Sequence, residues 1–432
     1  MKNYKIIKNK IELESLELSS LTTKIKDGTH SSFKDSNNKD SKILYSAKNI
    51  KNSNIIEGKN ERRISLEDYK KIVNNGFPKK GDILLTIVGT IGESMIWNKE
   101  HSEAFQRSVA FIRCNNLIIP EYLKYAFKSN YLKNDISRRI KVGAQPGIYL
   151  KDLAKLKIKI TTISQQKRIA EVLSKQESII NKTKDLIEQL EKRNTFMLDE
   201  LLSGRLRIKE ENGQVEFYKN PDDNWQTVLM NDENINLPKE WSTINLGDRG
   251  ISFIKTGIEK FDGNKQYYAT GSITKFKMDK EPTEIVSYDN RTSRANLDIK
   301  DNSIYFARMK DTLKVLRFKT KDNKILSTGF LGLQVDINKF NLDFIFFNII
   351  SNYFQKNKDK NCNGATQKSL SDASAKKIKI IFPNLDEQYK ISIIMNNLYN
   401  EKEKYEELLI EEQKKFDFLL EELMSGRLRI EE

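Results

Sequence analysis

The feature that most constrains this chain is an internal repeat. The octapeptide LLSGRLRI at residues 201–208 returns as LMSGRLRI at residues 423–430, an offset of 222 in a chain of 432 residues. A match of this length does not arise from composition, and self-similarity at a fixed offset indicates repeated structural units. The chain is therefore two copies of one unit, and the offset sets the register for comparing all other positions.

A long stretch without proline or glycine precedes each copy of the octapeptide, and its apolar residues step by four and three. This spacing, kept for more than four heptads, is typical of a coiled-coil seam. Five seam positions are polar: Gln176, Thr183, Asn194, Lys402 and Glu412. The predicted apolar seam comprises Ile169, Leu173, Ile180, Ile187, Leu190, Met197, Leu201, Ile391, Met395, Leu398, Tyr405, Leu409, Phe416, Leu419 and Leu423.

Both ends of each predicted helix carry a signal. Ser164 and Asp386, each followed by a glutamine two residues on, predict N-caps, and Gly204 and Gly426 predict C-terminal caps. About forty residues give a rod of roughly 60 Å. Two such helices related by a repeat most simply pair with each other, antiparallel about a pseudo-twofold axis. The alternative is that each helix packs on its own domain.

The repeat extends into the segments upstream of the helices. Ser129-Asn130-Tyr131 recurs as Ser351-Asn352-Tyr353, and Gly143-Ala144 recurs as Gly364-Ala365. GDILLTIVG (81–89) and DNSIYFARM (301–309) both predict buried strands. The sequence thus predicts an α+β fold with two mixed α/β domains and two long helices. The expected boundaries are domain 1 at 1–162, helix 1 at 163–203, a linker at 204–237, domain 2 at 238–384, helix 2 at 385–425 and a tail at 426–432.

The chain has few residues for catalysis. Two histidines and two cysteines nearly exclude a Cys/His zinc site or a Cys-His nucleophile pair, and the phosphate-loop pattern GxxxxGK[ST] is absent. We expect a binding protein that holds no metal. Cys114 and Cys362 are expected to be reduced, buried thiols. No run of eighteen apolar residues and no signal peptide is present, so we expect a cytoplasmic protein without a membrane span.

The positive charge sits in two blocks. Residues 1–163 carry 31 Lys and Arg against 17 Asp and Glu, and residues 204–385 carry 30 against 23. The first helical stretch is neutral, and residues 386–425 carry 5 against 11. Two basic domains suggest a polyanion partner such as nucleic acid, although a lysine-rich chain can also reflect an AT-rich genome. We expect the acidic second helix to face protein, either the first helix or another subunit.

In its order of elements the chain resembles the specificity (S) subunit of type I restriction–modification systems. The resemblance covers nearly the whole chain and rests on the order domain, helix, domain, helix, with the 222-residue repeat. Local motifs that carry it are KDGTH, GDILLT, LPKEW, GATQKSLS and PNLDEQ. The first copy departs from the pattern, because GATQKSLS becomes GAQPGIYL and PNLDEQ becomes TTISQQ. These departures bear on the first recognition loop rather than on the architecture.

The resemblance implies a DNA-binding subunit that catalyses nothing. Each domain would read one half of a bipartite, asymmetric site in double-stranded DNA, and the helix pair would fix the spacer. Two modification (methyltransferase) subunits, which bind adenosylmethionine, would dock around the helices. Two restriction subunits with ATP- and Mg-dependent translocase and nuclease activity can join. No cofactor would be bound by this chain itself.

Contacts to DNA should come from basic and polar side chains on loops, with Lys and Arg on phosphates. Arg291 and Arg294 flank a loop-like TS pair, and Arg308 follows a strand-like segment where Asp336 or Asp311 could pair with it. The candidates in domain 1 are Lys26, His30, Lys34, Lys48, Arg62, Arg63, Arg107, Lys141 and Gln145. The candidates in domain 2 are Lys255, Lys265, Tyr267, Tyr268, Arg291, Arg294, Arg308, Lys310, Gln367 and Lys368.

Two other classes of function stay open on the sequence. One is a non-catalytic helical scaffold whose basic domains touch nucleic acid unspecifically. The other is an enzyme whose active site the motifs do not reveal. Unspecific binding collapses with salt, whereas specific binding survives competitor DNA. An enzyme would require a pocket with clustered titratable groups, which two histidines make improbable.

Overall fold

The computed structural model describes residues 5–7, 12–141, 145–211 and 214–431 and divides the chain into two compact units. Unit 1 comprises Met1–Lys184 and Glu407–Glu432, and unit 2 comprises Asp185–Glu406. Each unit therefore combines one globular domain with part of both long helices. Gly143 and Ala144, in the first copy of the predicted Gly-Ala match, lie outside the described residues.

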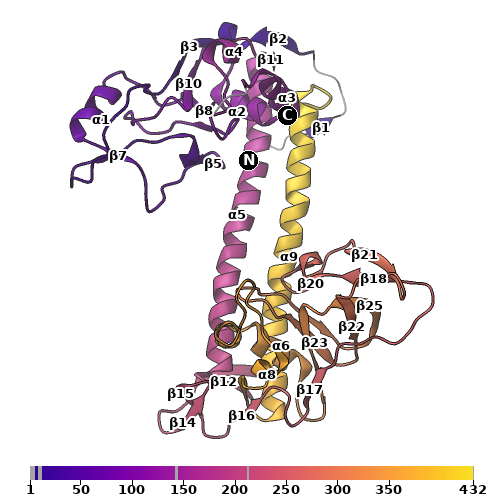
Figure 1. Ribbon diagram of the computed structural model, residues 1–432. Helices are drawn as coiled ribbons and strands as arrows, with labels where there is room; N and C mark the ends of the chain where they lie inside the picture. The colour runs from indigo at the N-terminus through magenta and orange to yellow at the C-terminus, as the bar shows by residue number, and fades with distance from the viewer. Residues whose placement is uncertain (1–4, 8–11, 142–144, 212–213, 432) are drawn as a thin grey trace. The chain divides into compact units, whose positions relative to one another are not determined.

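Unit 1 is built on a four-stranded antiparallel sheet in the order β3-β10-β8-β9 (Figure 1). β8 was predicted from the 81–89 pattern, and all four of its residues are buried. The strands are β3 Thr22–Asp27, β10 Val109–Cys114, β8 Ile83–Thr86 and β9 Ser94–Ile96. The helices around the sheet are α2 Pro120–Lys128, α3 Asn130–Arg139 and α4 Leu150–Ala154, with a 3-10 turn η1 at Leu18–Leu21.

Unit 2 repeats this framework with the sheet β17-β26-β23-β24. Every residue of β23 and of the first helix after the sheet, α6, is buried. The strands are β17 Ile251–Ile254, β26 Phe330–Val335, β23 Ser303–Ala307 and β24 Val315–Phe318. The helices are α6 Leu342–Ile350, α7 Asn352–Lys360 and α8 Asp372–Ala375.

The parts of the two domains beyond the shared sheet differ. Unit 1 has two short antiparallel pairs and a helix, whereas unit 2 has a second four-stranded sheet in the order β21-β18-β25-β22. The unit 1 elements are β4 Lys42–Ile43, β7 Arg63–Ile64, β5 Ile50–Lys51, β6 Asn54–Ile55, η2 Ala47–Asn49 and α1 Leu66–Val73. The unit 2 elements are β21 Glu284–Ser287, β18 Asn264–Tyr268, β25 Asp322–Ser327, β22 Ala295–Ile299, η3 Thr270–Ser272, β19 Ile273–Thr274 and β20 Lys277–Met278.

The two long helices are α5, Ile163–Leu202, and α9, Leu385–Met424, and they pack antiparallel within each unit (Figure 1). In unit 1 the Gln176 amide donates to the backbone oxygen and the carboxylate of Glu412. In unit 2 Asn194 donates to the backbone oxygen of Leu398 at 2.9 Å. The predicted antiparallel pairing is confirmed. The helices also contribute residues to the domain cores, so the alternative, in which each helix packs on its own domain, holds in part.

Burial along the predicted seam varies with position. Ile187, Tyr405 and Leu409, which are half-buried, lie within a few residues of the boundary between the units. Met197 and Leu398 are also half-buried. The buried seam residues are Ile169, Leu173, Ile180, Leu190, Leu201, Ile391, Met395, Phe416, Leu419 and Leu423.

The C-terminal ends of the two long helices agree with the prediction from the sequence, whereas their N-terminal ends differ from it. Gly204 and Gly426 follow the helices with φ of 71° and 76°, the left-handed geometry expected of a glycine cap. The helices begin before Ser164 and Asp386, so these residues are not the N-caps. The backbone N–H of Glu387 instead donates to Asn384 Oδ1 at 2.9 Å.

The predicted linker and tail form strands. Residues 206–211 and 214–219 form one antiparallel hairpin pair, residues 225–230 and 233–238 form a second, and the tail strand pairs antiparallel with the first strand of the chain. The elements are β12 Leu206–Glu211, β13 Gln214–Lys219, β14 Trp225–Met230, β15 Glu233–Pro238, β28 Arg429–Glu431 and β1 Lys5–Ile7. Equivalent pairs join each domain start to its end: β2 Glu14–Glu17 with β11 Lys157–Ile160, and β16 Ser242–Asn245 with β27 Lys379–Phe382.

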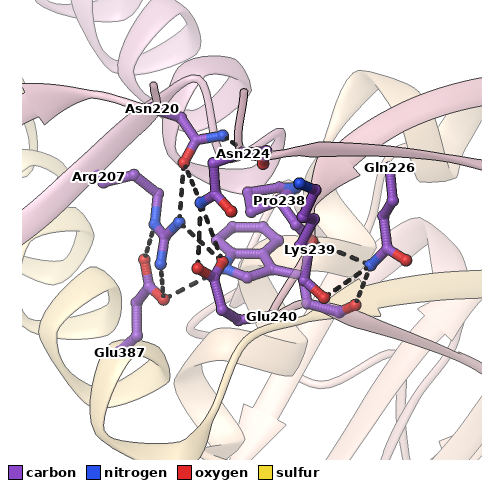
Figure 2. A network of polar contacts seen from close by, with 9 residues as sticks. Arg207, Asn220, Asn224, Gln226, Pro238, Lys239, Glu240 and Glu387 are labelled. Carbon is purple, nitrogen blue, oxygen red and sulfur yellow. Dashed lines mark hydrogen bonds and ion pairs between the residues drawn. The ribbon is translucent and has the colours of Figure 1, made fainter. Parts of the chain in front are cut away.

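A buried ion pair ties the first of these hairpins to α9 in unit 2. Figure 2 shows the Arg207 guanidinium facing the Glu387 carboxylate, with Nε to Oε1 at 2.6 Å and Nη2 to Oε2 at 3.0 Å. Trp241 Nε1 donates to the same carboxylate at 3.1 Å. Burial lowers the pKa of Arg207, but hydrogen bonding to Glu387 outweighs it and raises the pKa overall. The pair fixes the entry into the second domain.

The long helices also meet the helix that follows the shared sheet in each domain, α2 in unit 1 and α6 in unit 2. In unit 1 Lys124, Tyr125 and Lys128 on α2 all bind Glu177 on α5, with Lys124 Nζ at 2.8 Å and the Tyr125 hydroxyl at 2.9 Å. We call these four residues anchor cluster 1. Two ammonium groups share one carboxylate, and burial, the larger cause, lowers the pKa of Lys124 despite Glu177.

Aromatic side chains make the equivalent contact in unit 2. Tyr399, at the repeat position of Glu177, lies 5.5 Å from Phe347 on α6 and 6.1 Å from Phe276, ring centre to ring centre. Phe346 packs on Phe347 at 5.4 Å. We call these four residues anchor cluster 2. They line a cavity of about 400 Å³.

Candidate nucleic-acid interface

One pocket in unit 1 brings together predicted DNA-contacting residues from distant parts of the chain. It has a volume of about 470 Å³ and lies where β3 ends, beyond β8 and beside the segment that leads into α4. Gly147 bridges to both Val88 and Lys141, which holds that segment against the sheet. The backbone N–H of Ile148 donates to the oxygen of Ile87 at 2.9 Å. The sheet framework thus presents a loop-lined hollow.

Four of the nine predicted residues of domain 1 line this pocket: His30, Arg107, Lys141 and Gln145. They are exposed, and together they offer cationic and amide donors. Asp27 also lines the pocket and binds His30 Nε2 at 2.7 Å, so one carboxylate acceptor lies among the donors. A set of donors and an acceptor matches the base edges of the DNA grooves.

Sequence reasoning missed two residues of this pocket. Asp27 belongs to the KDGTH motif, but it is not among the predicted residues because phosphate contacts require positive charge. Tyr149 lines the pocket with 62% of its surface exposed, and no charge or periodicity marks it in the sequence. Aromatic rings can stack on bases or contact sugars, so an exposed tyrosine in a GIYL segment was the available signal.

The other candidates of domain 1 lie outside this pocket. Arg62 donates to Phe33 O at 2.6 Å and pairs with Asp35 at 2.7 Å, which ties a loop to β7. Arg63 donates to Ser41 in the same way. Lys48 pairs with Glu61, Lys26 lies over the Phe77 ring, and Lys34 is exposed. The structure therefore gives Arg62 and Arg63 partners within the fold.

Unit 2 has the same loop framework with other side chains. Ser369 bridges to Met309 and Asn363, as Gly147 does to Val88 and Lys141. The backbone N–H of Lys310 donates to Lys368 O at 3.0 Å, and its repeat counterpart Gly89 donates to Pro146 O at 3.2 Å. Lys310, Lys368 and the exposed Gln367, at the repeat position of Gln145, thus share one surface.

Arg308 lies beside this surface with a partner that the sequence analysis did not name. It pairs with Asp372 at 2.6 Å, not with Asp336 or Asp311, and it donates to the oxygens of Phe330 and Leu370. Asp372 begins α8, which the fold alone brings next to the end of β23. Arg308 thereby joins the sheet to the loop.

The remaining candidates of domain 2 are dispersed. Tyr267 and Tyr268 are 4% and 3% exposed and belong to core clusters, because β18 lies inside the second sheet. Their burial argues against direct contact with DNA. Arg291 lies over the Tyr288 ring at 3.9 Å and Lys265 over the Phe261 ring at 4.5 Å. Lys255 and Arg294 are exposed.

Several features bear on other classes of function. Among the described residues, no three His, Cys, Asp or Glu side chains gather to hold a metal ion. In the same parts of the chain, no helix combines the length and apolar character needed to cross a bilayer. Both cysteines are free; Cys362 is buried as expected, whereas Cys114 is half-buried.

Comparison with known proteins places the chain in a family. The model of the type I restriction modification DNA specificity domain matches residues 10–192 and again residues 238–412. The chain belongs to this family and carries two copies of its domain. The two matches start 228 residues apart and end 220 residues apart, close to the octapeptide offset of 222.

Individual relatives agree with this assignment. The MjaIX specificity subunit of Methanocaldococcus jannaschii is 25% identical over 392 residues, 86% of this chain and 83% of the relative. The MjaVIII specificity subunit of the same organism is 30% identical over 152 residues, 34% of this chain and 36% of the relative. The alignments with the first curated relatives thus span only about a third of their length.

Solved structures share the fold. The S subunit of a type I restriction–modification system from M. genitalium matches with a TM-score of 0.57 at 18% identity, over 96% of each chain. A chain solved in work on complex assembly and conformational transition of the type I R-M system matches with a TM-score of 0.52 at 11% identity, over 95% of this chain and 97% of that chain.

Proposed function

We propose that this chain is the DNA-reading, non-catalytic specificity subunit of a type I restriction–modification enzyme. Each domain reads one half of a bipartite, asymmetric site in double-stranded DNA, and the paired helices set the spacer between the halves. Family membership, with two copies of a DNA specificity domain in one chain, supports this proposal.

The observation that carries the proposal is a shared framework with unlike loops. The bridges around Gly147 recur around Ser369, so both units present a loop at the same place on the same sheet. The side chains on that loop differ, because Lys141 corresponds to Asn363 and Pro146 to Lys368. Loops that vary on a fixed scaffold are suited to reading different sequences.

The partners follow from the same proposal. Two modification subunits dock on the chain and hold adenosylmethionine, and two restriction subunits with ATP and Mg can be added. This chain supplies the sequence reading and holds no cofactor. A scaffold with unspecific nucleic-acid binding is the alternative; the pocket that gathers Asp27 with four donors favours specific reading, since a carboxylate weakens unspecific attraction to phosphates.

The spacer proposal is tested by lengthening α5. We expect that four residues inserted near Lys184, where unit 1 gives way to unit 2, change the spacer of the methylated motif and leave both half-sequences intact. The measurement is genome-wide mapping of methylated adenine in cells that carry the variant. A variant that keeps the original spacing would show that the helices do not act as the ruler.

A further inference from the structure

The loop between β23 and β24, residues 308–314, carries part of the predicted DNA surface of unit 2. Its counterpart in unit 1, residues 87–93 between β8 and β9, has the same length. The unit 1 loop turns at Gly89 and Gly92, whose φ values of 78° and 96° are left-handed. Unit 2 keeps neither glycine, and Asp311 adopts a φ of 54°. This backbone region is costly for a residue with a side chain, so the turn requires contacts that hold it.

The helix α7 supplies these contacts through a buried ammonium group. The Lys358 side chain is 1% exposed, and its Nζ donates to the backbone oxygens of Met309 at 3.1 Å and Thr312 at 2.8 Å. The Asp359 carboxylate lies 3.3 Å from the same Nζ and accepts from the backbone N–H of Asp311 at 3.1 Å. The three protons of the ammonium thus meet two carbonyls and a carboxylate. The loop is held on both sides of its left-handed residue.

The fold itself does not require a lysine at this position. The repeat counterpart of Lys358 is Ile136 on α3, which is buried in the core of unit 1. An apolar side chain therefore fills the equivalent place there. Burial of an ammonium group costs free energy unless its protons find acceptors. Its use in unit 2 indicates a requirement that apolar packing does not meet, and its backbone acceptors both belong to the loop.

The loop that Lys358 holds is joined to residues that we expect to read the second half-site. The sulfur of Met309 accepts from the Gln367 amide at 3.5 Å. The backbone N–H of Lys310 donates to the backbone oxygen of Lys368 at 3.0 Å. A shift of the loop would therefore displace both of these neighbours. Lys358 itself cannot contact DNA, because it is buried.

We propose that Lys358 is a positioning residue for the reading of the second half-site. Its ammonium group fixes residues 308–312 in the geometry that turns Lys310 and Gln367 towards DNA. The inference rests on the proposed function in taking DNA as the ligand of this surface. In unit 1, glycines shape the loop and Ile136 replaces the lysine. A change at Lys358 should therefore alter the reading of one half-site and leave the other intact.

The test uses the full chain in complex with its modification subunit, and oligonucleotides that carry the motif mapped from methylated adenines. Lys358→Met removes the ammonium group and keeps most of the length of the side chain. We expect discrimination against single base changes in the second half of the site to fall roughly tenfold, about what one base pair contributes. Discrimination in the first half should not change.

The matched control is Lys360→Met, which removes the same charge from the same helix. Lys360 pairs with Asp232 rather than with the loop, and its side chain is 49% exposed. This variant should keep the wild-type discrimination in both halves. If it relaxes the second half as much as Lys358→Met does, the effect comes from the lost charge alone and the inference is wrong.

Hydrogen exchange reports on the loop directly. The backbone N–H groups of Lys310 and Asp311 are hydrogen-bonded in the fold. They should exchange roughly tenfold faster in Lys358→Met, while the amides of α6 exchange as in the wild type. If Lys358→Met does not fold, Asp359→Ala takes its place, because this side chain is 23% exposed. It removes the acceptor of Asp311 and should relax the second half in the same direction.

Two further results would overturn the inference. A lower melting temperature with unchanged discrimination in both halves would show that Lys358 only stabilises the fold. Equal relaxation in both halves would show that it does not act through the loop of unit 2. The proposed function fails separately, if cells that carry the wild-type chain methylate no bipartite motif.

Discussion

The two anchor clusters occupy equivalent places in the repeat and hold them by opposite chemistry. In anchor cluster 1 the Glu177 carboxylate binds two ammonium groups and a phenol, whereas in anchor cluster 2 Tyr399 takes its place among phenylalanine rings. The backbone framework around them is the same. The fold therefore requires a filled contact between domain and helix at this point, and it does not prescribe whether charge or apolar surface fills it.

The two copies of the octapeptide show a second contrast. Arg207 and Arg429 are the same residue of LRI, but Arg207 is buried against Glu387, while the Arg429 side chain is 44% exposed and lies 3.9 Å from Glu431. The helix position opposite differs, because Gln165 corresponds to Glu387. Gln165 Nε2 instead donates to the backbone oxygen of Ile430 at 3.0 Å. The same arginine thus holds a junction in one unit and faces solvent in the other.

The largest expected effect separates these two arginines. Arg207→Ala leaves the buried Glu387 carboxylate without its charge partner, which costs roughly 3–5 kcal/mol. Arg429→Ala, the matched control, should change the free energy of unfolding by less than about 0.5 kcal/mol. Urea unfolding of both variants measures the difference. Equal effects would show that the buried pair does not hold the junction of unit 2.

The next effect concerns the charge of anchor cluster 1. Burial raises the pKa of Glu177, but Lys128 and Lys124 outweigh burial and hold the pKa at about 2. A carboxylate with a lowered folded pKa stabilises the protein above its unfolded pKa, and this contribution is lost as the pH falls towards the folded value. Glu177→Gln should therefore cost about 3 kcal/mol at neutral pH, because each unit of pKa shift corresponds to roughly 1.4 kcal/mol.

The pH dependence sharpens this comparison. The stability difference between the wild type and Glu177→Gln should shrink as the pH falls from about 5 to about 2. Tyr399→Phe in unit 2 keeps the ring and should show no such dependence. A Glu177→Gln deficit that stays constant over this range would mean that packing rather than charge holds the contact.

Substitutions on the two loop surfaces should have smaller effects, and each should change DNA binding at one half-site only. Arg107→Ala should weaken binding to the first half of the site by about 1–3 kcal/mol and relax the preference there. Gln367→Ala should do the same for the second half only. Competition binding against oligonucleotides with single base changes measures both. Loss at both half-sites from one substitution would contradict separate reading by the two units.

The smallest effect is expected for a phosphate contact. Lys368→Ala should weaken binding to all sequences alike and lower the salt slope by about one. Titrations at several salt concentrations measure this slope. A change in sequence preference would instead place Lys368 at a base edge.

The sequence predicts the parts of this molecule that local rules govern. The four-three spacing and the capping glycines Gly204 and Gly426 fix where the helices lie and end, and the repeat fixes their pairing. The N-caps lie earlier than predicted, because Asn384 provides an oxygen at the right distance and Asp386 is already helical. The sequence predicts a linker at 204–237, where the structure has hairpins, because short polar strands carry only a weak hydrophobic pattern.

Other residues could not be placed because their surroundings come from distant parts of the chain. Tyrosine is a common residue type in binding loops, so the sequence predicts that Tyr267 and Tyr268 contact DNA. In the structure both side chains are buried, because β18 is covered on both faces. Arg308 pairs with Asp372 because the loop before α8 lies against the sheet, and these two residues are far apart in the sequence. The pocket at Asp27 and Tyr149 likewise joins segments more than a hundred residues apart, and no spacing rule connects them.

The central claim is that one chain reads two unrelated half-sites with two copies of one scaffold. Replacement of residues 1–162 by the corresponding domain of another family member, followed by genome-wide mapping of methylated adenine, tests it most directly. The account predicts a motif in which one half is new, while the other half and the spacer are unchanged. A motif altered in both halves, or the unaltered original motif, would contradict it.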